Sequence, residues 1–536
     1  MPGGAEVNTV APLLIAGQWQ AAQDGTGSFR AFDPASGEAI GPVFPRSGVA
    51  DVEQALAAAS AAAPQLAATG PECIAAFLDA YAAALEADAE TLVQLAHAET
   101  GLPATPRLRG NELPRTCNQL RQAAAATRNR SWTQPVIDTA AGLRTHHAPL
   151  GKPVLVFGPN NFPFAFNAVS GGDFAAAIAA RNPVIAKAHP AHPATSRRLA
   201  EHARRAADTA GLPAATVQLL YDVEPALGLR LAGDARLGAI AFTGSRAGGL
   251  ALKQAADAAG IPFFGELSSL NPVFLLPGAL AERGPALAEE FSGSCLLGSG
   301  QFCTNPGLVI VPEGAAGDAF VADVQARFAA TAPLPLLSQG VLASLRKAIT
   351  ALREAGAQLL CGGEAGDTGF RHAPTLLTVA AQDFLANPQG FQHEAFGPCS
   401  LLVRVADVAR MQALAATLEG QLTGTLYRAA DGSDDDAWQA LAATLRPRVG
   451  RLIANRMPTG VLVSPAQQHG GPFPASTQPG FTAVGLPAAI LRFTALQAYD
   501  NVPDALLPPE LRDRNPGGLL RCIDRQWTTA DIGAGA

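Results

Sequence analysis

The segment that decides the fold contains two short apolar runs, PVLVFG at residues 153–158 and PVIAKA at residues 183–188, with helical periodicity between them at residues 164–181. A strand, a helix and a second strand in this order indicate a parallel crossover. The same alternation continues through a helix at 194–211, strands at 217–221 and 237–242, and a helix at 246–259. This segment predicts an α/β fold with a doubly wound sheet, which binds ligands at the carboxyl ends of its strands.

The residues before and after this segment predict other kinds of secondary structure. Upstream, residues 1–48 predict a surface β-ribbon, residues 49–128 three or four packed helices, and residues 132–149 a hairpin or extended arm. The helical stretch contains expected breaks at Pro64, at Gly70-Pro71 and at residues 101–106. Downstream, residues 266–457 predict a second α/β lobe with strands at 273–276, 308–311 and 401–405, and the proline- and glycine-rich residues 460–536 are expected to cover other parts or a partner subunit.

The composition excludes several classes of protein. A chain of 536 residues with 48% hydrophobic and 15% charged residues is expected to divide into two or more lobes. The net charge of −7 argues against a nucleic-acid partner, and seven scattered cysteines without a C-x-x-C pair favour a reducing compartment and predict no metal site. No stretch approaches the roughly 18 apolar residues of a membrane span, and residues 1–19 lack the regions of a secretory leader. We therefore expect a cytoplasmic protein with no membrane partner.

Residues 298–307, GSGQFCTNPG, place Cys303 in a chargeless, glycine-rich connection between a helix and a strand. Such a loop lets a substrate approach the main chain, and a thiol there is a nucleophile if a base stands nearby. The alternative is that Cys303 is a small buried hydrophobic residue.

Four further features lie at predicted strand ends. Asn161, in GPNNFPF (158–164), is either an amide donor for an oxyanion or a helix cap. FTGSRAGG (242–249) is a glycine-rich turn before a helix, which suits an anion. Glu266, in FFGELSSLNP (263–272), is either a general base or a solvated carboxylate. Glu394 and Phe396 precede a Gly-Pro turn in HEAFGP (393–398).

In this order the motifs resemble those of the NAD(P)-dependent aldehyde dehydrogenase superfamily over about residues 12–505. The cysteine motif G-Q-x-C stands as Gly300-Gln301-Phe302-Cys303, the glutamate motif as Glu266-Leu267-Ser268-Ser269, and the N-F-P motif as Asn161-Phe162-Pro163. FTGSRAGG, AKAHPAHP, SSLNPVFLLPGAL, GQFCTNPGL and HGGPFPAST look like the branch of 2,5-dioxovalerate (α-ketoglutarate semialdehyde) dehydrogenases, which is similar to the fatty aldehyde dehydrogenase of luminous bacteria.

The resemblance implies an aldehyde dehydrogenase-like α/β fold whose domains we expect at particular residues. These are a Rossmann-like cofactor-binding domain (1–131 and 152–265), an α/β catalytic domain (266–459), a small β oligomerisation arm with a bridging segment (132–151 and 460–500), and a C-terminal tail (501–536). Members of this family pair through such an arm, so a homodimer is expected, with a homotetramer as the alternative.

The resemblance also implies the chemistry. Cys303 attacks the aldehyde carbon, Asn161 and the Cys303 backbone N–H hold the oxyanion, a hydride passes to NAD(P), and Glu266 activates the water that hydrolyses the thioester. The cofactor-binding residues implied are Lys187 at the adenosine ribose, Gly244, Ser245 and Gly249 at the pyrophosphate, Glu394 at the nicotinamide ribose and Phe396 beside the ring. Pro190 has no hydroxyl for a 2′-phosphate, and Asp222 and Glu224 stand where a basic residue would favour NADP, so NAD is favoured over NADP.

The substrate implied is 2,5-dioxovalerate, whose distal carboxylate requires a cation. Arg115 or Arg121 can supply it, although either can equally be a solvated or structurally paired residue. The other substrate positions implied are Phe162, Phe166 and Val169 in the tunnel, Gln301 and Phe302 at its entrance, and His469, which either approaches the site or packs its loop. Because aromatic walls also suit aliphatic chains, a medium- or long-chain fatty aldehyde dehydrogenase is the alternative, and a catalytically silent structural or binding protein is the non-enzyme alternative.

Overall fold

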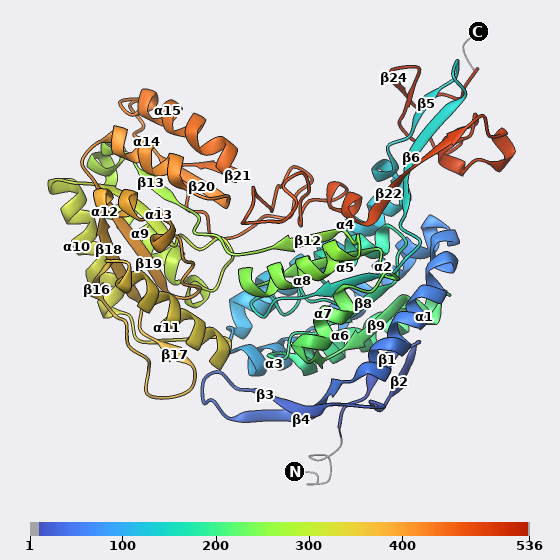
Figure 1. The fold of residues 1–536 in the computed structure, drawn as a ribbon, viewed down its shortest axis with the longest axis horizontal. Coiled ribbons are helices and arrows are strands. Elements are labelled where there is room, and N and C mark those ends of the chain that lie inside the picture. The colour runs from blue at the N-terminus through green and yellow to red at the C-terminus, as the bar shows by residue number, and fades with distance from the viewer. Residues whose placement is uncertain (1–9, 534–536) are drawn as a thin grey trace.

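The computed structural model describes residues 10–533 as two α/β lobes with a small β sheet projecting from them (Figure 1). Part of the segment expected to lack a secretory leader, residues 1–9, lies outside the described residues. Within residues 10–533 no helix is both long and apolar enough to cross a membrane.

The first lobe contains a seven-stranded sheet in the order β12-β11-β7-β8-β9-β1-β2. The five strands from β12 to β9 in this order run parallel to one another. The next strand, β1, pairs with β9 in the antiparallel direction. The strands are β1 (Leu13–Ile15), β2 (Gln18–Gln20), β7 (Val154–Phe157), β8 (Val184–Lys187), β9 (Val217–Leu220), β11 (Ala239–Thr243) and β12 (Phe263–Glu266). The parallel crossovers predicted from residues 153–259 are confirmed.

The helices of this lobe depart from prediction at two places. They are α1 (Val49–Ala68), α2 (Pro71–Ala87), α3 (Ala89–Thr100), the π-helix η1 (Ala104–Glu112), α4 (Leu113–Asn129), α5 (Gly172–Ala179), α6 (Pro193–Thr209), α7 (Pro225–Ala232) and α8 (Arg246–Ala258). The break predicted at Pro64 is wrong, since α1 continues through it. An interior proline costs a helix about 3 kcal/mol, and the buried face of α1, which includes Ala59, Ala63 and Leu66, offsets that loss by packing.

The helix predicted from residue 164 begins only at Gly172. Residues 160–171 form successive turns instead. The backbone N–H groups of Phe164 and Ala165 donate to the carboxylate of Glu112, from another helix, so they do not require helical partners. A tertiary contact therefore overrides the local helical pattern.

The second lobe contains a sheet in the order β16-β18-β19-β14-β13-β20-β21. In β14, Leu308 and Ile310 face one apolar cluster whereas Val309 and Val311 face another, so both faces of the sheet are buried by helices. Its strands are β13 (Val273–Leu275), β14 (Leu308–Pro312), β16 (Gln358–Cys361), β18 (Thr375–Ala380), β19 (Cys399–Val405), β20 (Gln421–Tyr427) and β21 (Val449–Ala454). Its helices are α9 (Pro277–Leu296), η4 (Leu297–Gly300), α10 (Ala315–Ala330), α11 (Gln339–Glu354), α12 (Ala381–Ala386), α13 (Pro388–Phe391), α14 (Val408–Thr417) and α15 (Asp435–Leu445).

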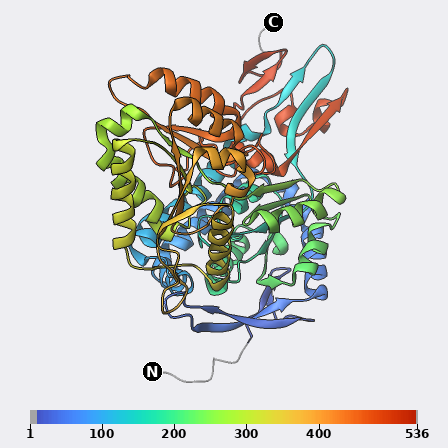
Figure 2. The ribbon, with the colours of Figure 1, turned by 60° about the vertical axis from the view of Figure 1, so that its left-hand side comes forward.

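A third, five-stranded sheet forms the arm, in the order β22-β6-β5-β23-β24. The hairpin predicted at residues 132–149 is present as two of its strands, and the C-terminal segment adds the other three. The strands are β5 (Val136–Asp138), β6 (Leu143–Pro149), β22 (Thr494–Asp500), β23 (Arg521–Ile523) and β24 (Gln526–Thr528). Figures 1 and 2 both show this sheet standing clear of the two lobes, with the C-terminus beside it.

Two small sheets complete the fold. The ribbon predicted near the N-terminus pairs with β10 in the order β10-β4-β3, and a two-stranded sheet joins β15 to β17. Their bounds are β3 (Gly27–Phe32), β4 (Ala39–Ser47), β10 (Asp222–Val223), β15 (Leu334–Pro335) and β17 (Arg371–His372).

Candidate active site

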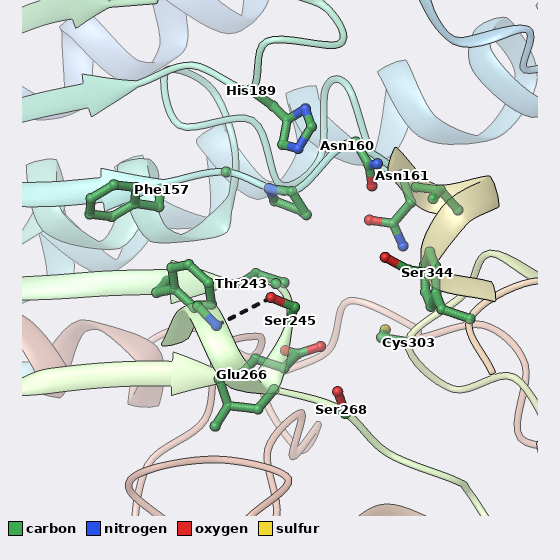
Figure 3. A pocket seen from close by; sticks show the side chains of 18 of the residues that line it. Phe157, Asn160, Asn161, His189, Thr243, Ser245, Glu266, Ser268, Cys303 and Ser344 are labelled. Atoms are coloured by element: carbon green, nitrogen blue, oxygen red, sulfur yellow. Dashed lines mark hydrogen bonds between the residues drawn. The ribbon is translucent and has the colours of Figure 1, made fainter. Parts of the chain in front are cut away.

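A cavity of about 620 Å³ lies at the carboxyl ends of β7, β8, β11 and β12, where the two lobes meet. Its position is the one expected for a doubly wound sheet. All of the predicted catalytic and cofactor-binding residues except Gly249 line it: Asn161, Lys187, Gly244, Ser245, Glu266, Cys303, Glu394 and Phe396. Figure 3 shows the side chains from both lobes directed into this space.

The backbone around Cys303 is held in a tight turn. Gly298, Ser299 and Gly300 all have positive φ angles, 56°, 60° and 68°. A Cβ atom on Gly300 would lie 2.0 Å from the carbonyl oxygen of Gly397, so only glycine fits there. Asn271 donates from Nδ2 to the carbonyl oxygen of Cys303 at 2.9 Å, which anchors the nucleophile from below.

The Cys303 sulfur lies 3.4 Å from Nε2 of His469 and is partly buried. Burial raises the pKa of the Cys303 thiol well above its ordinary value, and the Glu266 carboxylate raises it further by its charge and by a hydrogen bond. The guanidinium groups of Arg115 and Arg451 oppose this rise. The resting thiol is therefore protonated near neutral pH, and attack on a substrate requires a proton acceptor.

The Glu266 carboxylate, paired with His469, is a candidate for that acceptor. Nε2 of His469 lies 2.9 Å from Oε1 of Glu266, whereas the other atoms, Oε2 of Glu266 and Nδ1 of His469, have no hydrogen-bond partner. Placing the imidazole proton on Nε2 leaves only an acceptor unpaired, which costs less than burying an unpaired N–H. Glu266 thus keeps one carboxylate oxygen without a hydrogen-bond partner.

The same three residues bear on the prediction that the chain has no metal site. Ligand atoms of Glu266, Cys303 and His469 lie within 4.8 Å of one another, close enough to hold a metal ion. Sequence spacing concealed this cluster, because His469 is 166 residues from Cys303. All three groups fit a nucleophile and its base, and we assign them to that chemistry.

Asn161 follows β7 and faces Cys303. Its side-chain Nδ2 donates to the carbonyl oxygen of Gln301 at 2.9 Å, which leaves the second amide N–H for another acceptor. In Figure 3 the amide nitrogen of Asn161 points toward Cys303, with the Glu266 carboxylate on the other side of the cavity. Asn160 lines the same cavity. The arrangement suits an amide that donates to an oxyanion formed at the sulfur.

Gln301 does not shape the entrance, contrary to the sequence-based expectation. Its Oε1 accepts from the backbone N–H of Leu337 at 2.9 Å, and its Nε2 donates to the carbonyl oxygen of Gly298 at 3.2 Å. The buried side chain therefore ties the cysteine loop to the segment before α11. Its amide has two suitable backbone partners there, which explains why it turns away from the cavity.

An aromatic cluster lies beside the nucleophile. It consists of Phe162, Ala165, Phe166, Phe302 and Val484. The Phe162 ring packs edge-on against both Phe166 and Phe302, at centroid distances of 5.2 and 5.5 Å. Val169, also predicted to line the tunnel, belongs instead to the core of the first lobe and is fully buried. The turns between residues 164 and 171 explain this, since they direct Val169 away from Phe166.

Arg115 and Arg121 both lie on α4 but have different environments. The Arg115 guanidinium lies over the rings of Phe162 and Phe166, at 5.5 and 5.2 Å from their centroids, and its Nε and Nη2 are buried without a hydrogen-bond partner. Burial lowers the pKa of Arg115. Arg121 is exposed and makes two 2.6 Å hydrogen bonds to Glu86. Of these two arginines, Arg115 is the one with unused donors beside the aromatic cluster.

The cofactor half of the cavity is lined by a glycine-rich turn and a paired lysine. Ser245 caps α8 by accepting from the backbone N–H of Gly248 at 3.3 Å, which leaves the positive end of the helix facing the cavity. Gly248 lines the cavity, whereas Gly249 does not: a Cβ atom there would lie 2.3 Å from the Leu267 side chain. Gly248 therefore faces the cavity at the position predicted for Gly249, because Gly249 faces Leu267.

Lys187 and Glu394 carry the charges of this half. Nζ of Lys187 lies 3.4 Å from Oδ1 of Asp222, whose Oδ2 also accepts from Nε of Arg46 at 3.1 Å. Burial lowers the pKa of Lys187, although Asp222 opposes this. Burial raises the pKa of Glu394 to about 7 despite a hydrogen bond from Ser268. These residues fit a nucleotide whose ribose hydroxyls bond to carboxylates and whose pyrophosphate lies at a helix N-terminus.

Sequence reasoning missed several residues of the site. Arg107 and Glu112 lie next to Asn161, and Arg451 on β21 lies close enough to Cys303 to affect the pKa of its thiol. Glu112 stands within NELPRTCNQLR, beside the candidate cations Arg115 and Arg121. None of these residues belongs to a motif at a strand end, so their roles depend on tertiary contacts.

Comparisons with known proteins agree with this geometry. Residues 19–494 match the model of the aldehyde dehydrogenase family. The chain is 42% identical to α-ketoglutaric semialdehyde dehydrogenase 2 of Azospirillum brasilense over 94% of this chain and 97% of that protein, and 37% identical to α-ketoglutaric semialdehyde dehydrogenase of Acinetobacter baylyi over 90% and 93%. The crystal structure of a putative aldehyde dehydrogenase from Burkholderia cenocepacia superposes with a TM-score of 0.78 at 25% identity, over 94% of this chain and 99% of that one. The chain therefore belongs to the aldehyde dehydrogenase family.

Proposed function

We propose that this enzyme oxidises 2,5-dioxovalerate (α-ketoglutarate semialdehyde) to 2-oxoglutarate. The observation that carries the proposal is the Arg115 guanidinium, which is buried against Phe162 and Phe166 with two nitrogens unpaired. A buried cation without a partner is costly, and a substrate carboxylate supplies the missing acceptor. Two relatives at 42% and 37% identity are named for this same semialdehyde.

Oxidation begins at Cys303. Glu266 takes the proton of the thiol, the sulfur attacks the aldehyde carbon, and the carbonyl electron pair moves to oxygen. The second amide N–H of Asn161 and the backbone N–H of Cys303 donate to that oxyanion. Lys187, Ser245 and Glu394 would hold NAD(P), which would supply the acceptor for the hydride that this carbon loses, and Cys303 would then carry a thioester.

Hydrolysis of the thioester returns the enzyme to its starting state. Glu266 first releases the thiol proton to solvent. Its Oε2, which has no hydrogen-bond partner in the protein, then takes a proton from water. That water attacks the thioester carbon, and Glu266 passes the proton to the departing sulfur. The other carboxylate oxygen stays fixed by His469 at 2.9 Å. His469 thus orients the base, and the released sulfur regains a proton.

NAD is the cofactor we favour over NADP. Lys187, the residue at the end of β8, is already paired with Asp222 at 3.4 Å. Glu224 lies nearby, 3.6 Å from the same Arg46 that bonds to Asp222. A 2′-phosphate would meet these carboxylates, whereas a 2′-hydroxyl can donate to one of them.

The arm is proposed to join two subunits into a homodimer, with a homotetramer as the alternative. Its β22 lies at the edge of the five-stranded sheet and exposes the Leu496 side chain by 67%. An open strand edge with an apolar side chain is a ready pairing surface. We propose the domain division of 1–131 with 152–265 for cofactor, 266–459 for catalysis, 132–151 with 460–500 for the arm and bridge, and 501–536 for a tail whose strands β23 and β24 belong to the arm sheet.

The test is a screen of about a dozen aldehydes with both cofactors. The proposal expects the highest kcat/KM for 2,5-dioxovalerate with NAD. A medium- or long-chain aliphatic aldehyde is the second candidate, favoured by the apolar cluster around Phe162 and Phe302. A higher kcat/KM for octanal or a longer aldehyde than for 2,5-dioxovalerate would replace the first proposal with the second.

A further inference from the structure

An ion pair lies behind the predicted oxyanion donor, outside the cavity lining. Arg107 and Glu112 stand on the π-helix η1, and their side chains pair through Nη1 and Oε2. The Glu112 side chain is fully buried, and that of Arg107 is 13% exposed. A buried ion pair requires further hydrogen bonds to offset its lost hydration, so its other partners indicate what it holds.

Glu112 holds the turns that follow Asn161. Its Oε1 accepts from the backbone N–H of Phe164 at 2.8 Å and of Ala165 at 3.1 Å. These N–H groups lie in the non-helical segment before α5 and would otherwise be buried without acceptors. The carboxylate therefore replaces the helical hydrogen bonds that the sequence pattern predicts there.

Arg107 holds Asn161 itself. Its Nη2 donates to the backbone carbonyl oxygen of Asn161 at 3.1 Å. The same guanidinium lies 4.4 Å from the ring centroid of Phe162 and 5.5 Å from that of Phe302, the residue before Cys303. One side chain thus contacts both the loop that carries the amide and the loop that carries the sulfur.

Arg107 and Arg115 contact the same Phe162 ring but differ in their partners. Both terminal nitrogens of Arg107 bond to the protein, and Glu112 balances its charge. Arg107 leaves only Nε without a partner, whereas Arg115 has both Nε and the terminal Nη2 unpaired. This contrast separates a structural guanidinium from one available to a substrate.

We propose that Arg107, supported by Glu112, is a positioning residue that fixes the side-chain amide of Asn161 relative to Cys303. The inference rests on the proposed function, in which that amide donates to the oxyanion. Oxyanion donors act only when aimed at the developing charge, and a displacement of about 1 Å can cost roughly 100-fold in rate. Arg107 thus acts on turnover through Asn161 and independently of any substrate carboxylate.

A double-mutant cycle tests this with hexanal, which has no charge and so does not depend on Arg115. Arg107→Ala should lower kcat roughly 100-fold with a smaller change in KM, and Arg107→Lys should recover part of the loss. In the Asn161→Ala background, Arg107→Ala should lower kcat by less than about twofold. Arg109→Ala is the matched control, because Arg109 stands on the same helix but pairs with Glu90 at the surface, and its kcat should not change.

The outcomes distinguish this inference from the function on which it rests. If Asn161→Ala leaves kcat for hexanal unchanged, the oxyanion role of Asn161 is wrong. If Asn161→Ala lowers kcat but the Arg107→Ala loss multiplies with it, or if only KM changes, the positioning role is wrong. Should Arg107→Ala not fold, Glu112→Gln, which keeps the acceptor oxygen, is measured in both backgrounds under the same criteria.

Discussion

The unpaired guanidinium of Arg115 allows the effect of its replacement on kcat/KM to be predicted. Arg115→Met removes the charge but keeps an apolar stem on Phe162 and Phe166. Removing one partner of a buried, hydrogen-bonded charge pair costs about 2–4 kcal/mol, which corresponds to a loss of roughly 30- to 1000-fold in kcat/KM. The loss should fall mainly on KM, because the carboxylate lies away from the reacting carbon and is bound equally in the ground and transition states.

The assay compares 2,5-dioxovalerate with hexanal in steady-state kinetics. Arg115→Met should lose its activity only with the carboxylate-bearing aldehyde, and kcat/KM for hexanal should stay within about threefold. Arg121→Ala is the matched control on the same helix, since Arg121 bonds to Glu86 and is exposed. It should leave both substrates unaffected.

The unfolding temperature of Arg115→Met is a second test of the same reasoning. Nε and Nη2 of Arg115 have no partner in the protein, so replacing the guanidinium by an apolar group removes an unsatisfied buried charge. Arg115→Met should therefore unfold at the same temperature as the native enzyme or a higher one. Equal losses of kcat/KM for both aldehydes, or no loss for 2,5-dioxovalerate, would refute the carboxylate-anchor reasoning.

Three further predictions concern the nucleophile, the cofactor and the arm. Glu266 raises the pKa of the Cys303 thiol, so Glu266→Gln should lower that pKa and speed iodoacetamide labelling at pH 7.5 by roughly 10-fold. The same variant should lose oxidation, and labelling of the native enzyme should become faster from pH 7 to 9. Slower labelling of the variant would contradict the assignment. Asp222→Ser removes the ion-pair partner of Lys187 and should raise kcat/KM with NADP roughly 10-fold. The measurement compares initial rates with NADP and with NAD. An unchanged ratio of kcat/KM between the two cofactors would show that Asp222 does not set the selectivity. Leu496→Glu places a charge on the exposed edge of the arm and should shift the sedimenting species from dimer to monomer, whereas an unchanged mass would place the interface elsewhere.

The cysteine loop is an example of what the local sequence can predict. GSGQFCTNPG predicts a tight, glycine-rich connection, because positive φ angles at Gly298 and Gly300 are a local property that glycine supplies. The strands at 153–158 and 183–188 likewise follow from apolar runs of the right length, and their parallel pairing follows from the helices between them. These features depend on residues that are neighbours in the chain, so the sequence alone predicts them.

The sequence by itself determined the α/β lobes and the family motifs, and it predicted Cys303, Glu266 and Asn161 as the residues that carry the chemistry. Only the tertiary structure distinguished the two candidate cations on α4, because Arg121 is exposed and bonds to Glu86, whereas Arg115 lies over Phe162 and Phe166 with two unpaired nitrogens. It also brought His469 to Glu266 across 203 positions (469 − 266). Charge pairing and burial depend on residues distant in the chain, and no local pattern encodes them.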